Sequence, residues 1–141
     1  MGTWGHQVFC DDCAWDALDE LCESENLVED IERMLGEALQ CKDDYIEVDE
    51  CEYGLVAAAL VTVSLKGADW DLLDPTGSVG NPYEKLVQTV EKLDLSALKD
   101  KATDVLRIVK KDDSELRELW EDSEYYSDWL NVIDSLAEKL E

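Results

Sequence analysis

Residues 49–67, DECEYGLVAAALVTVSLKG, contain the longest apolar run of this sequence. Asp49 followed three residues later by Glu52 predicts a helix start of the capping-box type, and Gly67 is a typical helix stop. Between them the side chains are apolar on nearly every side of a helix, which is characteristic of a helix buried in the core. A buried strand over LVTVSL is the alternative interpretation, but no partner strand is visible elsewhere. The stretch therefore predicts a central helix.

The segments on either side carry the pattern of helices with one apolar face. Apolar residues recur at helical spacing in segments 14–22, 27–39, 83–93, 96–109, 112–120 and 129–140. A loop rich in turn residues, ADWDLLDPTGSVGN, occupies residues 68–81. With 141 residues, of which 45% are hydrophobic, the chain is long enough for one core. We expect an all-α fold, a compact single-domain bundle of six or seven helices over residues 1–141, with little or no sheet.

The charge of the chain limits its direct ligands. It has 36 acidic and 12 basic residues, a formal net charge of -24. The first 53 residues hold 17 acidic residues against Arg33 and Lys42, a net charge of -15. Nucleic acid and anionic membranes are poor direct ligands for such a chain, because phosphate contacts need clustered lysine and arginine. We expect a basic protein partner, with a nucleic-acid-binding protein as one possibility.

The sequence also gives an expectation for the cellular location. Its start lacks the basic and apolar regions of a secretory signal, and its longest apolar run is about half of the ~20 residues that a membrane span needs. These features predict a cytoplasmic protein. The five cysteines are then expected to be reduced thiols.

The N-terminal segment offers two kinds of thiol chemistry. His6, Cys10 and Cys13 have the spacing of three zinc ligands. A structural zinc site needs a fourth ligand, and the usual second ligand pair, another CxxC or an HxxxH, is absent from the sequence. A CxxC at a helix start also resembles a redox site, although Asp11 and Asp12 between the cysteines would raise the thiol pKa. No nucleophile elbow or phosphate loop is present. We therefore expect no catalytic residue, no metal and no cofactor, and keep a metal- or thiol-dependent enzyme using His6, Cys10 and Cys13 as the alternative.

Several blocks of the chain resemble one family. The N-terminal block is MGTWG followed by the pattern F-x-D-D-x-A-x-D at Phe9, Asp11, Asp12, Ala14 and Asp16. It resembles an uncharacterised bacterial family, known only as a domain of unknown function, whose members begin Met-Gly-x-Trp-Gly. Residues 45–67 and 114–140 are similar to the middle and C-terminal blocks of that family. Cys10 and Cys13 depart from its usual F-x-N-D-x-A pattern, which suggests that the CxxC belongs to this chain and not to the family.

The resemblance implies a small, acidic, mainly helical bacterial or phage protein, with no activity or cofactor attached. It gives an expected structural cap at the N-terminus, made of Gly2, Trp4, Gly5, Phe9, Asp12, Ala14 and Asp16.

Our functional hypothesis is a non-enzymatic, acidic protein-binding module that docks its negative surface on a basic partner. An inhibitor or immunity-type role is an analogy, and mimicry of nucleic acid by surface carboxylates is a sharper variant. The candidate partner-binding residues combine exposed acids with tryptophans that are common interface anchors: Asp11, Asp12, Trp15, Asp16, Asp19, Glu20 and Trp70.

Overall fold

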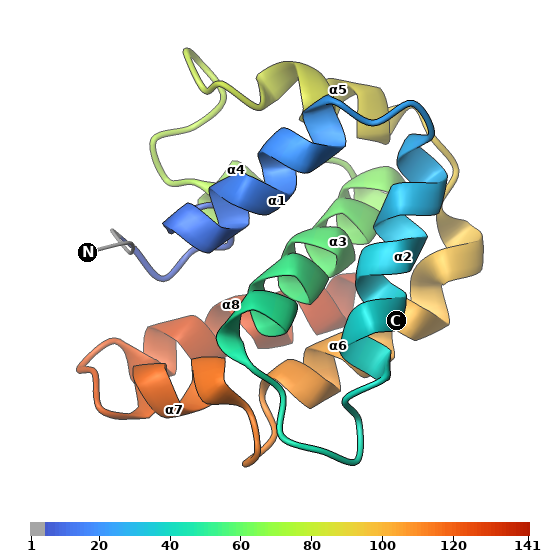
Figure 1. Ribbon diagram of the computed structural model, residues 1–141. Coiled ribbons are helices and arrows are strands. Elements are labelled where there is room, and N and C mark those ends of the chain that lie inside the picture. The colour runs from blue at the N-terminus through green and yellow to red at the C-terminus, as the bar shows by residue number, and fades with distance from the viewer. Residues whose placement is uncertain (1–4) are drawn as a thin grey trace.

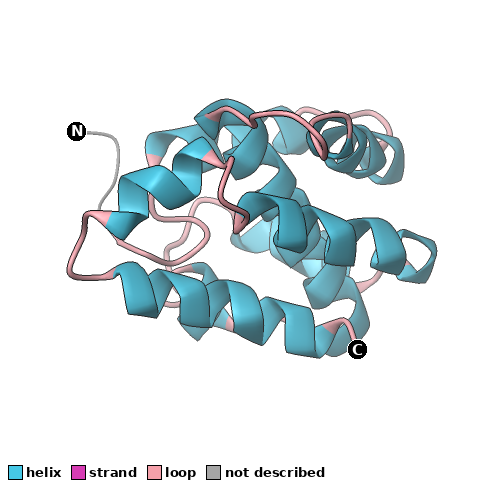
Figure 2. Ribbon diagram, turned by 90° about the horizontal axis from the view of Figure 1, so that it is seen from below, coloured by secondary structure: helices cyan, strands magenta, loops and turns pink. Residues whose placement is uncertain are grey.

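The protein is all-α. A computed structural model describes residues 5–141, and in this range the chain forms eight α-helices and one short 3-10 helix, without a strand (Figures 1 and 2). The helices are α1 (Asp12–Cys22), α2 (Leu27–Leu39), α3 (Val48–Lys66), α4 (Trp70–Leu73), α5 (Glu84–Glu91), η1 (Ser96–Leu98), α6 (Lys99–Val109), α7 (Glu115–Glu121) and α8 (Tyr126–Lys139). The count exceeds the six or seven expected because α4 is a single turn, too short to show a helical period.

Helix α3 is the centre of the fold. Figure 1 shows it surrounded by other helices, and it packs against α1, α2, α5, α6, α7 and α8. All nine residues from Leu55 to Val63 are buried. At Gly54 an added Cβ would lie 2.9 Å from Cβ of Ala38 and 3.0 Å from Cγ1 of Val105, so glycine allows α2 and α6 to approach closely. The central helix is confirmed, and the strand alternative over LVTVSL is wrong.

The start of α3 differs from the expected capping box. The helix begins at Val48, and its N-cap Glu47 makes no side-chain capping hydrogen bond. Instead, the backbone N–H of Val48 donates to Oε1 of Glu115 at 2.8 Å. The side chain that caps α3 thus comes from a residue 67 positions later in the sequence than Val48. Glu52 has no part in this cap and lies inside the helix.

Two connections bring the starts of α3 and α7 together. The N–H of Ile46 donates to the carbonyl of Asp113 at 2.9 Å, and the N–H of Glu115 donates to the carbonyl of Ile46 at 2.9 Å. The Nζ of Lys111 donates to three carbonyls of the α2–α3 connection, at 2.7 to 3.0 Å. These bonds fix the N-terminal end of α7 beside that of α3. Among residues 5–141, no helix has the length and apolar character that crossing a bilayer requires.

Candidate functional site: an acidic pocket at three helix starts

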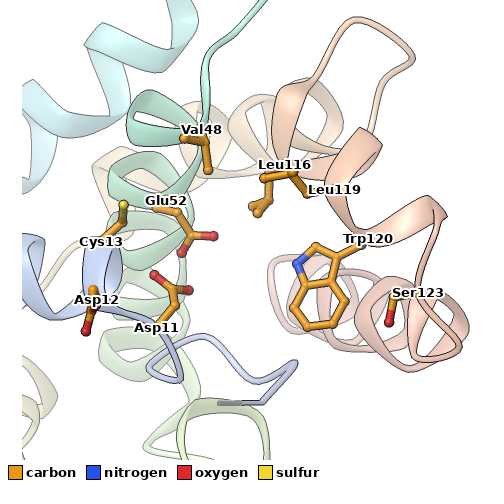
Figure 3. Close-up of a pocket in the computed structure, with 9 residues that line it drawn as sticks. All are labelled: Asp11, Asp12, Cys13, Val48, Glu52, Leu116, Leu119, Trp120 and Ser123. Carbon is orange, nitrogen blue, oxygen red and sulfur yellow. The ribbon is translucent and has the colours of Figure 1, made fainter. Parts of the chain in front are cut away.

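The N-terminal ends of α1 and α3 and one side of α7 surround a pocket of about 230 Å³ (Figure 3). We call it the acidic pocket. It is lined by Asp11, Asp12, Cys13, Val48, Glu52, Leu116, Leu119, Trp120 and Ser123. One side carries carboxyl groups and the opposite side is apolar. Leu119, at the rim, is 60% exposed, so the pocket opens to solvent.

Glu52 is the most unusual residue of the pocket. It lies in the second turn of α3, is only 4% exposed, and its Oε2 accepts no hydrogen bond from the described residues. Figure 3 shows its carboxyl group turned toward that of Asp11, with the indole of Trp120 across the pocket. Buried carboxylates are normally paired or hydrogen-bonded, because loss of water is costly for a charge. Here the facing group is a second carboxyl.

Asp11 is held in place by the start of α1. It is the N-cap residue, and its Oδ1 accepts a hydrogen bond from the N–H of Ala14 at 2.8 Å. Aspartate is favoured at this position because it satisfies an otherwise unpaired backbone donor. The sequence placed Asp11 correctly at the start of the helix, but only the packing of α1 on α3 places it opposite Glu52.

The two carboxyl groups perturb each other. Burial, followed by the hydrogen bond and charge of Asp11 and the charge of Asp49, raises the pKa of Glu52 well above its usual range. Burial also raises the pKa of Asp11, while hydrogen bonds from Glu52 and from the backbone at Ala14 and Cys13 act in the opposite direction. Two facing carboxyl groups are joined only by a shared proton. The pair therefore retains a proton at pH values where an exposed glutamate has lost its own.

A second, smaller pocket of about 180 Å³ adjoins the first through Cys13. It is lined by Cys13, Asp16, Glu37, Asp49, Glu50 and Tyr53. The thiol of Cys13 donates to Oδ1 of Asp49 at 3.4 Å, which links α1 and α3 between the two pockets. Among the described residues, neither pocket is lined by lysine or arginine.

Seven carboxyl groups line the two pockets, and six of them, at the N-terminal halves of α1 and α3, form what we call the acidic surface: Asp11, Asp12, Asp16, Asp49, Glu50 and Glu52. Within residues 5–141, none of the six forms an ion pair, whereas Glu37, the seventh carboxyl that lines the pockets, pairs with Arg33 at 2.9 Å. Among the described residues the six carboxyls are therefore not matched by a basic side chain.

The other candidate partner-binding residues lie outside the two pockets and have contacts within the protein. Trp15 is half-buried, with its Nε1–H donating to the carbonyl of Phe9 at 2.7 Å and its ring edge-on to Tyr83. Trp70 is edge-on to Phe9, with ring centroids 6.1 Å apart. The hydroxyl of Tyr83 donates to Asp19 at 2.8 Å. These side chains form an aromatic cluster that packs the N-terminal segment against α4 and α5.

The expected N-terminal cap is described only in part, because Gly2 and Trp4 lie outside the described residues. Phe9 and Ala14 are fully buried, and the N–H of Phe9 donates to the carbonyl of Leu73 at 2.7 Å. An added Cβ at Gly5 would lie 3.2 Å from Cβ of Cys10, a close approach. Asp12 and Asp16 are exposed on α1 and belong to the acidic surface.

The thiols and His6 are not gathered into one site. Cys10 contacts Gln7, whereas Cys13 contacts Asp49, and the ring of His6 stacks on Tyr125 with centroids 6.4 Å apart. Burial is the main cause that raises the pKa of Cys10 and of Cys13 to about 12, so both remain thiols at neutral pH. In the described part of the chain, no three His, Cys, Asp or Glu side chains are arranged to hold a metal ion.

The sequence analysis missed Glu52 and the apolar wall of the pocket, Leu116, Leu119 and Trp120. A signal for Glu52 was present: it is a carboxylate followed within a turn by a helix segment that is apolar all round. No local signal identifies Trp120, because it reaches the pocket only through the packing of α7.

Comparison with known proteins gives a family and no activity. The family described as a domain of unknown function, DUF4259, matches residues 2–132. No curated protein and no solved structure matches the chain.

Proposed function

We propose that this chain, which belongs to the DUF4259 family, is an acidic protein-binding module that docks on a basic partner protein through its acidic surface. The observation that carries the proposal is the group of six carboxyls at the starts of α1 and α3, around two adjoining pockets, which have no ion pair and no basic neighbour in the pocket linings among residues 5–141.

Physical chemistry supports a binding role for such a surface. Complementary charge accelerates encounter and excludes partners of like charge, while shape at short range gives specificity. Acids in the first turn stabilise a helix, and Asp12 and Asp49 do so for α1 and α3. Capping alone does not account for Asp16, which lies beyond the first turn, or for the burial of Glu52.

The test is capture of a partner by matched charge variants. The first variant replaces Asp12, Asp16 and Asp49 with asparagine. The control replaces Asp43, Asp100 and Asp128, which are exposed, form no ion pair among the described residues, and include two first-turn acids, of α6 and α8. Both variants change the net charge by the same amount, so they separate a local surface from overall charge.

We expect wild type and control to capture the same basic protein at low salt and to release it at about 0.5 M salt, where the Debye screening length between charges falls to a few ångströms. The surface variant should lose that protein. Equal loss in both variants, or capture that is insensitive to salt, would contradict a specific acidic surface.

The identity of the captured protein decides the finer role. An inhibitor or immunity-type function requires that binding block the activity of the partner. Mimicry requires that the partner bind nucleic acid and that nucleic acid compete with this chain. The alternative enzyme, dependent on His6, Cys10 and Cys13, predicts stoichiometric zinc by elemental analysis that is lost in Cys10→Ser.

A further inference from the structure

We propose that the acidic pocket is an anchor site for a single guanidinium side chain of the basic partner, with Glu52 and Asp11 accepting its N–H groups and the Leu119 and Trp120 wall packing on its stem. This inference rests on the proposed function, since it names the group that the acidic surface receives.

The first support is the state of Glu52. Glu52 is only 4% exposed and lines the pocket, and within residues 5–141 its Oε2 has no hydrogen-bond partner apart from the proton that the pair shares. A buried carboxyl is costly unless charged or N–H donors satisfy both of its oxygens, and the only facing group here is a second carboxyl. A cationic donor entering the pocket would remove that cost and take the place of the shared proton.

The charged surroundings of the pair strengthen this attraction. On α1, Asp12 acts on Asp11, and on α3, Asp49 acts on Glu52. On α7, Glu115 caps α3 at Val48 beside the pocket. All these groups are acidic, so a cation at the pair is attracted by carboxyl groups on α1, α3 and α7, whose full charges exceed the partial positive charges of the helix N-termini.

The shape of the pocket selects the kind of cation. Its volume of about 230 Å³ is below the ~300–1,000 Å³ of typical small-molecule sites, which suits one side chain. Among the described residues no three carboxyl, thiol or imidazole groups are arranged around a metal-ion position, which disfavours Ca²⁺ and its six to eight oxygen ligands. The apolar wall and the exposed Leu119 at the rim instead suit a long aliphatic stem. Guanidinium fits best because it is planar, weakly hydrated, able to bond two carboxyls at once, and stacks on aromatic rings.

The probe is an acetylated and amidated Gly-Arg-Gly peptide, compared with Gly-Lys-Gly and with the neutral isostere Gly-citrulline-Gly. Binding is followed by the NMR signal of the Trp120 indole N–H, assigned by its loss in Trp120→Phe. We expect saturable shifts with the arginine peptide, weaker binding of the lysine peptide and none of citrulline. Glu52→Gln should lower the affinity for the arginine peptide about tenfold or more, and the variant with Asp43, Asp100 and Asp128 replaced should bind it as the wild type does.

A second readout is proton release. If guanidinium displaces the shared proton, calorimetry in buffers of different ionisation enthalpy will show protons released on binding by wild type and not by Glu52→Gln. General attraction to a negative surface releases none. Asp11→Asn, which preserves the N-cap, provides a second variant and should also weaken binding.

Three outcomes would overturn the inference: equal peptide affinity in wild type and Glu52→Gln, binding without proton release, or displacement of the proton by Mg²⁺ or Ca²⁺ and not by the arginine peptide. Partner capture that is lost in the Asp12, Asp16 and Asp49 variant but kept in Glu52→Gln would leave the proposed function standing and reject this anchor. Loss in neither variant would reject both.

Discussion

Replacing Glu52 with glutamine is expected to stabilise the protein at neutral pH and to flatten its dependence on pH. The side chain is buried at the start of the central helix and faces Asp11. Glutamine has the same shape, carries no charge, and can donate an N–H to the carboxylate of Asp11 permanently. The substitution thus fixes the hydrogen bond that the wild type forms only while it holds a proton.

The direction of this pH dependence follows from the raised pKa of both carboxyl groups, Asp11 and Glu52. Between the usual glutamate pKa of ~4.3 and the raised pKa of the pair, the folded state binds more protons than the unfolded state. The contribution of this pair to the free energy of unfolding is therefore fully present at low pH and is lost as pH rises through that window. One extra proton corresponds to a slope of about 1.4 kcal/mol per pH unit. Over the two units from pH 5 to pH 7 the loss would reach at most about 2.7 kcal/mol.

The assay is urea denaturation at several pH values between 5 and 8. Free energies of unfolding are compared only between variants with equal m-values, because a changed m-value would indicate that unfolding is no longer two-state. Glu25→Gln is the matched control, because it removes one exposed glutamate and changes the net charge equally. We expect the curves of wild type and Glu52→Gln to converge near pH 5 and to separate above it. Parallel curves for wild type and Glu52→Gln across this range would refute the shared proton.

Three further predictions concern the elements that build the site. Gly54→Ala should destabilise the protein by about 1–3 kcal/mol in urea denaturation, because its Cβ would crowd Ala38 and Val105; an unchanged midpoint would contradict the close approach. Glu115→Ala should lower the free energy of unfolding by about 1 kcal/mol, because α3 loses its cap. Glu115→Gln keeps an acceptor oxygen and should therefore retain most of that stability. Asp11→Ala should lower the melting temperature more than Asp11→Asn, since asparagine also caps a helix; equal losses would argue against the capping role.

Periodicity predicted most of the fold because it reports which face of a helix is apolar. The central helix and the flanking helices were anticipated from residues that are neighbours along the chain. The single turn α4 was missed because four residues contain no full period. The capping box at Asp49 was wrong because Glu115, far along the sequence, caps α3 instead.

For the candidate site, the sequence predicted only that acidic residues at the start of α1 would belong to it. The sequence pointed to Asp11, Asp12 and Asp16, which do belong to the acidic surface. It grouped them with Trp15 and Trp70, whose rings pack on Tyr83 and Phe9 instead. The sequence around an aromatic residue gives no local indication of whether its ring faces solvent or a neighbouring ring.

By itself, the sequence determined that this chain is an acidic helical domain built around one apolar helix, because composition and helical spacing are properties of neighbouring residues. Only the tertiary structure decided which carboxyls face each other. Asp11 and Glu52 are 41 positions apart, and they meet because α1 packs on α3 while the pairing of Ile46 with the α6–α7 connection brings Trp120 across from them. The burial of Glu52, and with it the raised pKa and the predicted preference for a guanidinium group, is a property of that packing.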